Sequence, residues 1–212
     1  MEEVDAFNRA AEDYDKWFDT HADWFSSELA ALKMAVPKSG KGIEIGVGTG
    51  RFARELGIKT GVEPSENMAT LASERGIEVL SGYAEDLPVE DAVFDYTLMV
   101  TVDCFLQDLL KAFKEARRIT KPGGAIIIGM ISKSSPLGKN YEQKKKDNPF
   151  YKSARFHEVE EVKKLLEQAG FQNFSFWQTL VNPEEETSEE PLEGFEKGGF
   201  VVIKAEKTAD KN

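Results

Sequence analysis

Hydrophobic residues recur at helical spacing through the first 36 positions of the chain. One set consists of Val4, Phe7, Ala11, Tyr14 and Phe18, and a second begins with Trp24, Phe25, Leu29 and Leu32. Because side chains three or four positions apart share one side of an α-helix, the two sets predict two amphipathic helices. Six aromatic residues fall within the first 25 positions, so we expect residues 1–36 to form a helical cap over an apolar site.

From Gly42 onward, short apolar runs alternate with helical segments. The expected strands are 43–47, 60–62, 78–80, 94–100 and 125–131, and the helices between them are 51–56, 67–75 and 109–119. Runs 94–100 and 125–131 are almost continuously apolar, which is typical of parallel strands covered on both faces. Strands that alternate with helices through right-handed crossovers predict an α/β fold with three layers, a doubly wound and mostly parallel sheet.

The polar segment 132–155 interrupts this alternation. It contains Tyr141, Phe150 and Tyr151, and three consecutive lysines at 144–146 that we expect to form a solvated loop face. A connection of this length in a compact domain is typically functional or disordered. We therefore predict an insert loop at 132–155 that acts as a lid and forms, with residues 5–32, a mobile cover over the site.

The last part of the chain predicts a helix followed by two strands. The helix spans 159–169 and ends at Gly170, and strands 171–180 and 199–205 follow without a helix between them. Such a pair forms an antiparallel hairpin on an otherwise parallel sheet. We expect a single domain over 1–206, with 207–212 as a frayed tail.

Composition narrows the functional classes. The chain has 212 residues, of which 27 are basic and 38 acidic, for a net charge of −11. This charge disfavours non-specific nucleic-acid binding. A single cysteine, Cys104, excludes an internal disulfide or a thiolate zinc site and is expected to be a small buried apolar residue. His21 and His157 form no recognisable metal motif, so we expect no metal.

The sequence also carries no sign of a membrane or export function. No apolar run approaches the ~20 residues that span a bilayer, and the acidic start is not that of a signal peptide. We therefore expect a cytoplasmic protein that does not bind membranes. The sequence leaves its oligomeric state open.

A glycine cluster between the first strand and the next helix is the main chemical signal. Gly46, Gly48 and Gly50 alternate with other residues, and Glu44 precedes them by two positions. Glycines at the carboxyl edge of such a sheet let the backbone approach a ligand closely. Glu63 ends the second strand, where a carboxylate can accept hydrogen bonds from both ribose hydroxyls of an adenosine. The cluster therefore predicts a nucleoside-binding site.

With these features the sequence resembles the class I S-adenosylmethionine (SAM)-dependent methyltransferases, in the subgroup of the ubiquinone and menaquinone biosynthesis C-methyltransferases. The resemblance runs from about residue 10 to 171. Besides the glycine motif, its ordered blocks are AEDYDKWF at 11–18, GVEPS at 61–65 with Met68, AEDLP at 84–88, Phe94-Asp95, EARRI at 115–119, KPGG at 121–124 and LEQAGF at 166–171. The family implies a seven-stranded sheet in the order 3-2-1-4-5-7-6, methyl transfer from SAM, and S-adenosylhomocysteine as product.

The resemblance also implies a cofactor-binding set. Its members are Tyr14, Glu44, Gly46, Gly48, Gly50, Glu63, Met68, Ala84, Glu85 and Thr101. By this analogy the glycines face the methionine part of SAM and Glu44 orients its amino group. Glu63 holds the ribose, Met68 packs on adenine, and backbone groups at 84–85 contact the adenine edge. Thr101 contacts the methionyl end, and Tyr14 closes the pocket.

Two positions depart from the family pattern. Tyr83 replaces a residue that is often polar, and positions 101–104, Thr-Val-Asp-Cys, replace a stretch that often contains histidine or polar aromatics. No substrate-side base can therefore be transferred from the family. The candidates from the residues themselves are His21 and Asp103, with Asp108 nearby, whereas His157 is expected to cap a helix or lie on the surface. In-line transfer to an unprotonated nucleophile needs no base.

The sequence favours an enzyme that methylates a small molecule, and two alternatives remain. A non-catalytic SAM-binding protein would have the same motifs, because a fold does not determine a function. An NAD-dependent oxidoreductase fits less well, since it needs a differently spaced third glycine and a longer chain for a substrate domain. The acceptor atom is not identified, because carbon, oxygen, nitrogen, arsenic and halide acceptors all occur on this scaffold.

Overall fold

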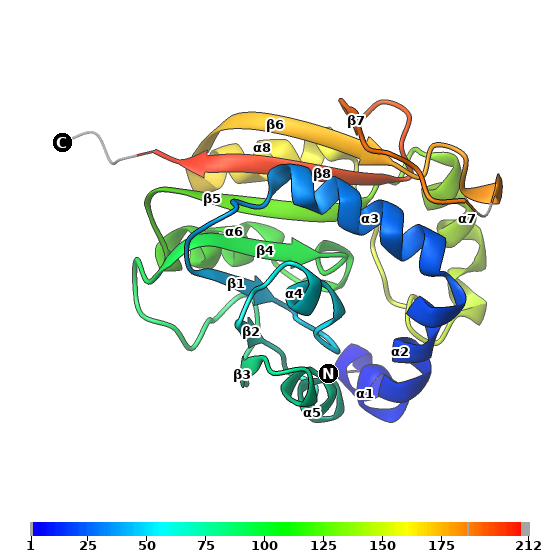
Figure 1. The fold of residues 1–212 in the computed structure, drawn as a ribbon, viewed down its shortest axis with the longest axis horizontal. Helices are drawn as coiled ribbons and strands as arrows, with labels where there is room; N and C mark the ends of the chain where they lie inside the picture. Colours follow the sequence, from blue (N-terminus) through cyan, green and yellow to red (C-terminus); the bar gives the residue numbers. More distant parts are fainter. Residues whose placement is uncertain (1, 186, 209–212) are drawn as a thin grey trace.

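The computed structural model describes residues 2–185 and 187–208, which form one sheet with helices on both faces (Figure 1). The strands are β1 (Gly42–Ile45), β2 (Thr60–Val62), β3 (Glu78–Leu80), β4 (Phe94–Val100), β5 (Thr120–Ile131), β6 (Phe171–Thr179), β7 (Leu192–Glu193) and β8 (Phe200–Lys207). Their order within the described residues is β3-β2-β1-β4-β5-β8-β6-β7. The predicted order is confirmed, with the short β7 as an added edge strand.

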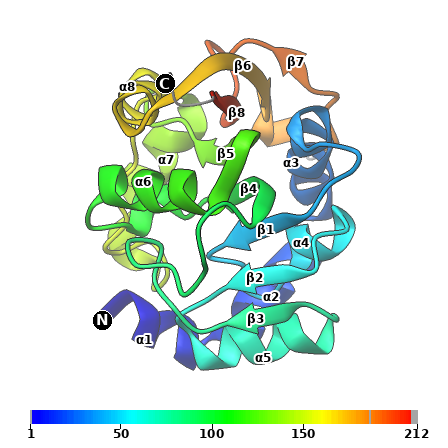
Figure 2. The ribbon, with the colours of Figure 1, turned by 90° about the vertical axis from the view of Figure 1, so that its left-hand side faces the viewer.

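The helices are α1 (Glu2–Arg9), α2 (Ala11–Thr20), α3 (Ala22–Ala35), α4 (Arg51–Glu55), α5 (Glu66–Glu74), α6 (Leu109–Ile119), α7 (Pro136–Lys144) and α8 (Val159–Ala169). Three short 3₁₀ turns are η1 (Asp103–Phe105), η2 (Lys145–Asp147) and η3 (Pro183–Glu185). Helices α6 and α8 lie on one face of the sheet, and α3 and α4 lie on the other (Figure 2).

Each face of the sheet has its own hydrophobic core. Ile43, Ile45 and Met99 point toward α6 and α8, where they pack with buried residues such as Phe113 and Leu166. The opposite cluster joins α3, α4 and the alternate strand residues, including Leu98 and Val202. Because strand side chains alternate between faces, one sheet serves both cores. This construction fixes the strand ends that carry the site.

The first five strands pair in parallel and the last three pair antiparallel. Strands β1 and β4 point toward the end of the molecule where α1, α2 and α7 lie (Figure 1). At the far end of β8, Lys207 is buried and its Nζ donates to the carbonyls of Arg117 and Thr120 at 2.8 and 2.7 Å. Lys207 therefore belongs to the sheet and not to a frayed tail; the rest of that predicted tail, beyond Thr208, lies outside the described residues.

The N-terminal cap contains three helices where two were predicted. The backbone leaves the helical conformation at Ala10 (φ −126°) and His21 (φ −121°). The apolar spacing continues across both bends, which is why the pattern does not reveal them. The segment predicted as a loop at 132–155 also contains helix α7 and η2. Pro136 occupies the first turn of α7, and the Ser135 hydroxyl accepts from the Gly138 N–H at 2.9 Å.

None of the described helices has the length and hydrophobicity needed to cross a bilayer. The buried thiol of Cys104 confirms the small apolar role expected for that residue.

Candidate functional site

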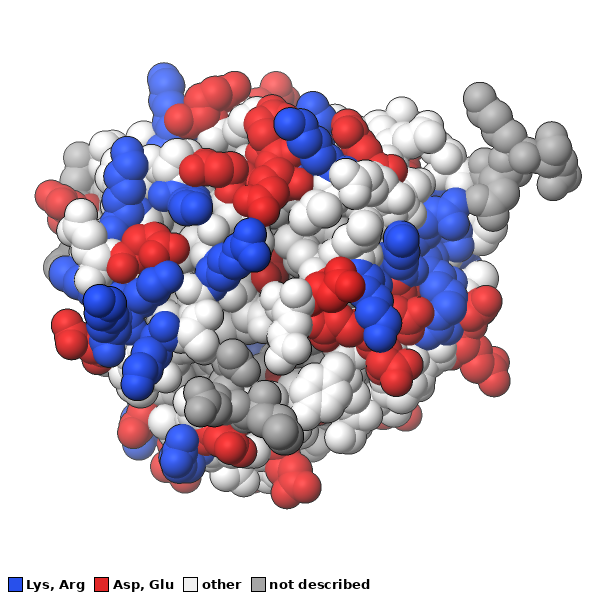
Figure 3. Space-filling model, turned by 180° about the vertical axis from the view of Figure 1, so that it is seen from behind, with Lys and Arg blue, Asp and Glu red and all other residues white. Residues whose placement is uncertain are grey.

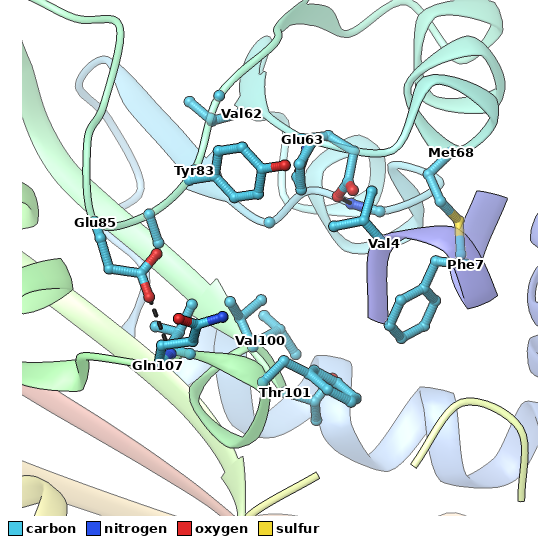
Figure 4. Close-up of a pocket in the computed structure, with 18 of the residues that line it drawn as sticks. Val4, Phe7, Val62, Glu63, Met68, Tyr83, Glu85, Val100, Thr101 and Gln107 are labelled. Carbon is cyan, nitrogen blue, oxygen red and sulfur yellow. Dashed lines mark hydrogen bonds between the residues drawn. The ribbon is translucent and has the colours of Figure 1, made fainter. Parts of the chain in front are cut away.

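A cavity of about 570 Å³ lies where the parallel strands β1 to β4 end. Its walls come from the loops after these strands, from α1 and α2, and from the segment that leads into α6 (Figure 4). This is the carboxyl edge at which doubly wound sheets bind ligands. The volume lies within the range of pockets that hold a ligand of nucleoside size.

The glycine loop wraps the end of β1 under this cavity. Gly46, Gly48 and Gly50 have φ values of +70°, +54° and +80°, which only glycine adopts without strain. A Cβ on Gly46 would lie 2.4 Å from Val102, whereas a Cβ on Gly48 would meet no atom within 4 Å. The open side of Gly48 therefore leaves room for a ligand to approach the backbone.

The Glu63 carboxylate is fixed at the end of β2. Its Oε2 accepts from the Gly48 N–H and its Oε1 from the Ser65 N–H, both at 2.9 Å. Burial raises the pKa of Glu63, and these two N–H groups partly offset that effect. Each oxygen keeps a further lone pair, so the oriented carboxylate can still accept ligand hydroxyls.

The opposite wall is built by the ends of β3 and β4. Thr101 has a φ of +52°, a strained conformation for a β-branched residue, and its N–H donates to the Gly129 carbonyl at 2.7 Å. Glu85 Oε1 accepts from the Gln107 N–H at 3.0 Å and thereby connects the loop after β3 to the loop after β4 (Figure 4). Backbone strain of this kind is concentrated at functional sites.

Eight of the ten predicted cofactor residues line this one cavity. They are Tyr14, Gly46, Gly48, Glu63, Met68, Ala84, Glu85 and Thr101. Gly50 lies behind it, as the N-cap of α4. Glu44 is buried within β1, where burial raises its pKa and the Ala53 N–H bonds its carboxyl; its Oε2 has no hydrogen-bond partner among the described residues.

The N-terminal helices are attached directly to this site. Asn8 Oδ1 of α1 accepts from the Ser65 hydroxyl at 2.7 Å, next to Glu63. Asp15 of α2 accepts from the Thr49 hydroxyl in the glycine loop at 2.6 Å, and it pairs with Arg51 and Arg75 at 2.8 and 2.7 Å. Sequence reasoning missed these anchors, although Asp15 lies within the family block at 11–18.

Asp108 is the one candidate base that lines the cavity; it is the N-cap of α6, and its Oδ1 accepts from the Lys111 N–H at 2.9 Å. His21 and Asp103 lie away from the cavity. The His21 ring stacks on Trp17 at 4.3 Å, its Nδ1 lies 3.0 Å from the Trp17 carbonyl oxygen, and it does not line the cavity. Asp103 is buried in η1, outside the lining, and burial raises its pKa to about 7. His157, expected at the surface or as a cap, is instead buried, with its Nδ1 3.3 Å from Glu161 Oε2.

A second cavity of about 60 Å³, which we call the aromatic chamber, adjoins the first one. Tyr14 and Thr101 line both cavities. The other residues of the chamber are Trp17, Phe18, Glu28, Phe52, Ile131, Tyr141, Asn148, Phe150 and Tyr151. It thus lies between the N-terminal helices and the segment after β5, the two parts that were predicted to cover the site.

Ring contacts join these two parts over the cavities. Phe150 stacks on Phe7 at 5.6 Å and packs edge-to-face on Tyr14 at 5.3 Å. Tyr151 contacts Phe105, which lines the larger cavity, at 5.6 Å. The two segments therefore meet as a cover; their mobility stays a prediction.

Sequence reasoning missed Glu28, the one carboxylic acid among the chamber residues. It has a relative exposure of 6% on the buried face of α3. Burial raises the pKa of Glu28 to about 8. The sequence did contain a signal for the burial of Glu28, because position 28 lies three residues after Phe25 and four before Leu32, on the apolar face predicted for that helix.

Comparison with known proteins agrees with this geometry. Residues 43–128 match the family model described as a methyltransferase domain. An uncharacterised protein of Methanocaldococcus jannaschii is 46% identical over 96% of this chain and 100% of its own length. A demethylmenaquinone methyltransferase of Staphylococcus aureus is 29% identical, over 74% of this chain and 77% of its own.

A solved structure extends the match to the whole fold. It is a SAM-dependent methyltransferase of Thermotoga maritima, named a possible histamine N-methyltransferase. The two chains are 48% identical, with a TM-score of 0.93 over 96% of this chain and 99% of the other. The glycine loop, the oriented carboxylate of Glu63 and these relatives agree: the chain belongs to the class I SAM-dependent methyltransferases.

Proposed function

We propose that this enzyme transfers the methyl group of SAM to a small-molecule acceptor within the enclosed site. The observation that carries the proposal is the convergence of eight predicted cofactor residues on one cavity, which continues into a chamber under an aromatic cover. An enclosed acceptor site of this size suits a small molecule better than a polymer.

The geometry of the larger cavity supports the following residue roles. Glu63, held by two N–H groups, accepts the ribose hydroxyls, and the open side of Gly48 receives the methionine part. Met68 packs on adenine, and the backbone at Ala84 and Glu85 contacts its edge. Glu44 lies outside the cavity lining, so its role toward the amino group rests on the family resemblance.

The chain contributes alignment and the exclusion of water. When bound, SAM supplies an electrophilic methyl group on a positively charged sulfur. Tyr14 and Thr101, at the junction of the two cavities, position the groups that react, and the rings of Phe7 and Phe150 keep solvent out. No described residue of the larger cavity needs to act as a base for an acceptor that enters unprotonated.

The charge of the molecule also favours a small acceptor. The net charge is −11, and acidic and basic side chains are interspersed on the face shown in Figure 3. Such a surface repels a phosphate backbone overall. The names of the relatives above point to different kinds of acceptor, since one is a demethylmenaquinone methyltransferase and another is named a possible histamine N-methyltransferase. The names alone therefore do not fix the acceptor of this chain.

Calorimetry of S-adenosylhomocysteine binding tests the assignment. Glu63→Ala should weaken binding by about 1–3 kcal/mol, because it removes a charged acceptor from two hydroxyls. Glu74→Ala, on the exposed side of α5, is the matched control and should bind like the wild type. Equal affinity of Glu63→Ala and the wild type would show that the ribose does not bind at Glu63.

A further inference from the structure

We propose that the aromatic chamber binds the methyl acceptor and that Glu28 selects an acceptor carrying a positively charged amine. This inference rests on the proposed methyltransferase function and names the substrate class of the same site. It depends on three features of the chamber: a buried acid without a partner, walls of aromatic rings, and a shared boundary with the cofactor cavity.

The Glu28 carboxyl group is buried without a protein partner. Only 6% of the residue is exposed, and no described residue donates a hydrogen bond to its side chain or forms an ion pair with it. The described residues that line the chamber include no lysine or arginine. A buried acid in such surroundings costs stability unless a cation or donor joins it. A ligand amine would therefore supply the cation that the chamber itself does not contain.

The walls suit the rest of an organic cation. Tyr14, Trp17, Tyr141 and Tyr151 surround the chamber, and the rings of Tyr141 and Tyr151 meet edge-to-face at 4.9 Å. Aromatic faces attract ammonium groups, and this attraction strengthens where water is excluded. One carboxylate and several rings make a site for an ammonium group and disfavour an anionic acceptor.

The chamber is also placed correctly for transfer. Thr101 and Tyr14 separate it from the cofactor cavity, so an acceptor in the chamber lies next to the proposed methionyl end of the cofactor. An ammonium nitrogen has no free lone pair, so it would have to give its proton to the Glu28 carboxylate before it could accept a methyl group. A volume of about 60 Å³ accepts only a small head group. A larger acceptor would displace Phe150 and Tyr151 of the cover, which can therefore act as its entrance.

Protonation gives a specific signature of the pairing. Since the pKa of Glu28 is raised to about 8, the group is largely neutral at pH 7 in the empty chamber, and an ammonium partner should drive its proton into solution. The ionisable groups that face it from the other elements are Tyr14, Tyr141 and Tyr151, with Cys104 near them. Burial raises the pKa of each of these groups, so all stay neutral at pH 7.

The test is calorimetry of small aryl- and imidazolyl-ethylamines binding to the protein saturated with S-adenosylhomocysteine. Each amine is compared with the alcohol of the same shape, in two buffers that differ in ionisation enthalpy. The amine should bind, with proton release, and the alcohol should bind at least about tenfold more weakly. Glu28→Gln should lose about 10- to 100-fold in amine affinity and all proton release, while its affinity for S-adenosylhomocysteine stays unchanged.

Glu12→Gln, on the exposed face of α2, is the matched control and should behave like the wild type. Equal amine affinity in Glu28→Gln and the wild type would overturn the inference, as would equal binding of amine and alcohol. So would normal binding of S-adenosylhomocysteine with no amine binding at all, and that result would leave the proposed function intact. If the wild type does not bind S-adenosylhomocysteine, the proposed function is refuted instead.

Discussion

Glu28 and Glu63 are both buried acids, but their surroundings differ. Two backbone N–H groups hold the Glu63 carboxylate, whereas the residues that line the chamber with Glu28 are aromatic or apolar, apart from Thr101 and Asn148. Burial raises the pKa of both. A group that costs stability in the empty protein and lines a cavity is typical of a site maintained for function.

Replacing the ionisable carboxyl group of Glu28 with an amide should stabilise the empty protein. The folded-state pKa of about 8 exceeds the ordinary 4.5, so the folded state holds the proton more tightly and stability falls as pH rises from 4.5 to 8. Glu28→Gln avoids this loss. At pH 7 its free energy of unfolding should exceed that of the wild type by about 3 kcal/mol. Below pH 4.5 the two proteins should converge.

Urea denaturation at pH 5 and pH 7 measures this difference. Glu55→Gln, at an exposed position of α4, is the control and should change stability little at either pH. If Glu28→Gln is less stable than the wild type at pH 7, the carboxyl group has a stabilising partner and the chamber is not an unfilled site.

The sequence identified Glu63 and the glycines because their function depends on position along the chain. A residue that ends a parallel strand reaches the ligand edge of the sheet whatever its distant neighbours are. Glu28 and Asp15 depend instead on which elements surround them. The walls around Glu28 come from α2, α4, α7 and the ends of β4 and β5, and periodicity along one helix does not contain that information.

Among the elements, α2 is tied to the glycine loop and its neighbours by Asp15. The Asp15 carboxylate contacts Thr49 of the glycine loop, Arg51 of α4 and Arg75, which follows α5, and Asp19 of the same helix also pairs with Arg51 at 2.6 Å. The cover over the cofactor cavity is thus held by the same loop that is proposed to bind the cofactor. A change that loosens the cover should therefore also loosen the glycine loop, and the reverse.

Asp15→Asn should destabilise the protein by about 1–3 kcal/mol and weaken S-adenosylhomocysteine binding, because it removes the charge that holds Arg51 and Arg75. The side-chain hydrogen bonds with Arg51, Thr49 and Arg75 outweigh the effect of burial and lower the pKa of Asp15. The stabilisation is therefore fully present above the ordinary value of 3.8 and is lost as the pH falls through the lower folded-state value.

Thermal and chemical denaturation at neutral and acidic pH, together with calorimetry, test this prediction. Asp13→Asn, whose side chain is 79% exposed and lies 3.8 Å from Lys16, is the control on the same helix. It should change stability by less than about 0.5 kcal/mol. If Asp15→Asn behaves like this control, the ion pairs do not hold α2 in place.

The cover segments should be more dynamic than the sheet. The cover segments 5–32 and 132–155 meet over the cavities through ring contacts of Phe150 with Phe7 and Tyr14, whereas β4 and β5 are paired on both sides. Hydrogen exchange should be faster in the cover and should slow on addition of S-adenosylhomocysteine, most strongly around Tyr14. If the cover exchanges its amide hydrogens as slowly as β4 without ligand, and does not respond to ligand, it is a fixed part of the core.

The regular elements were predictable where local pattern and tertiary environment agree. Strands β2, β3 and β4 have the predicted bounds, since short runs flanked by glycines and helices leave few alternatives. Helix α7 was missed because its sequence is polar, although Ser135 and Pro136 are a recognisable start signal. The bends at Ala10 and His21 were missed because helical spacing tolerates a break between turns.

In the whole molecule, the two kinds of site occupy different parts of the fold. The cofactor cavity is built by the carboxyl ends of the parallel strands, the part that the sequence motifs cover. The aromatic chamber is built mainly by the N-terminal helices and the segment after β5, outside the alternating framework. Because of this division, the methyltransferase class could be predicted from the sequence, whereas the proposed acceptor class rests on the structure.

Methyl transfer itself is the most direct test. The purified protein is incubated with isotopically labelled SAM and a panel of small amines, alcohols, thiols and quinols, and mass spectrometry follows labelled products and S-adenosylhomocysteine. The account predicts that label enters an amine in step with S-adenosylhomocysteine formation. Tight binding of SAM without label in any amine of the panel would contradict it.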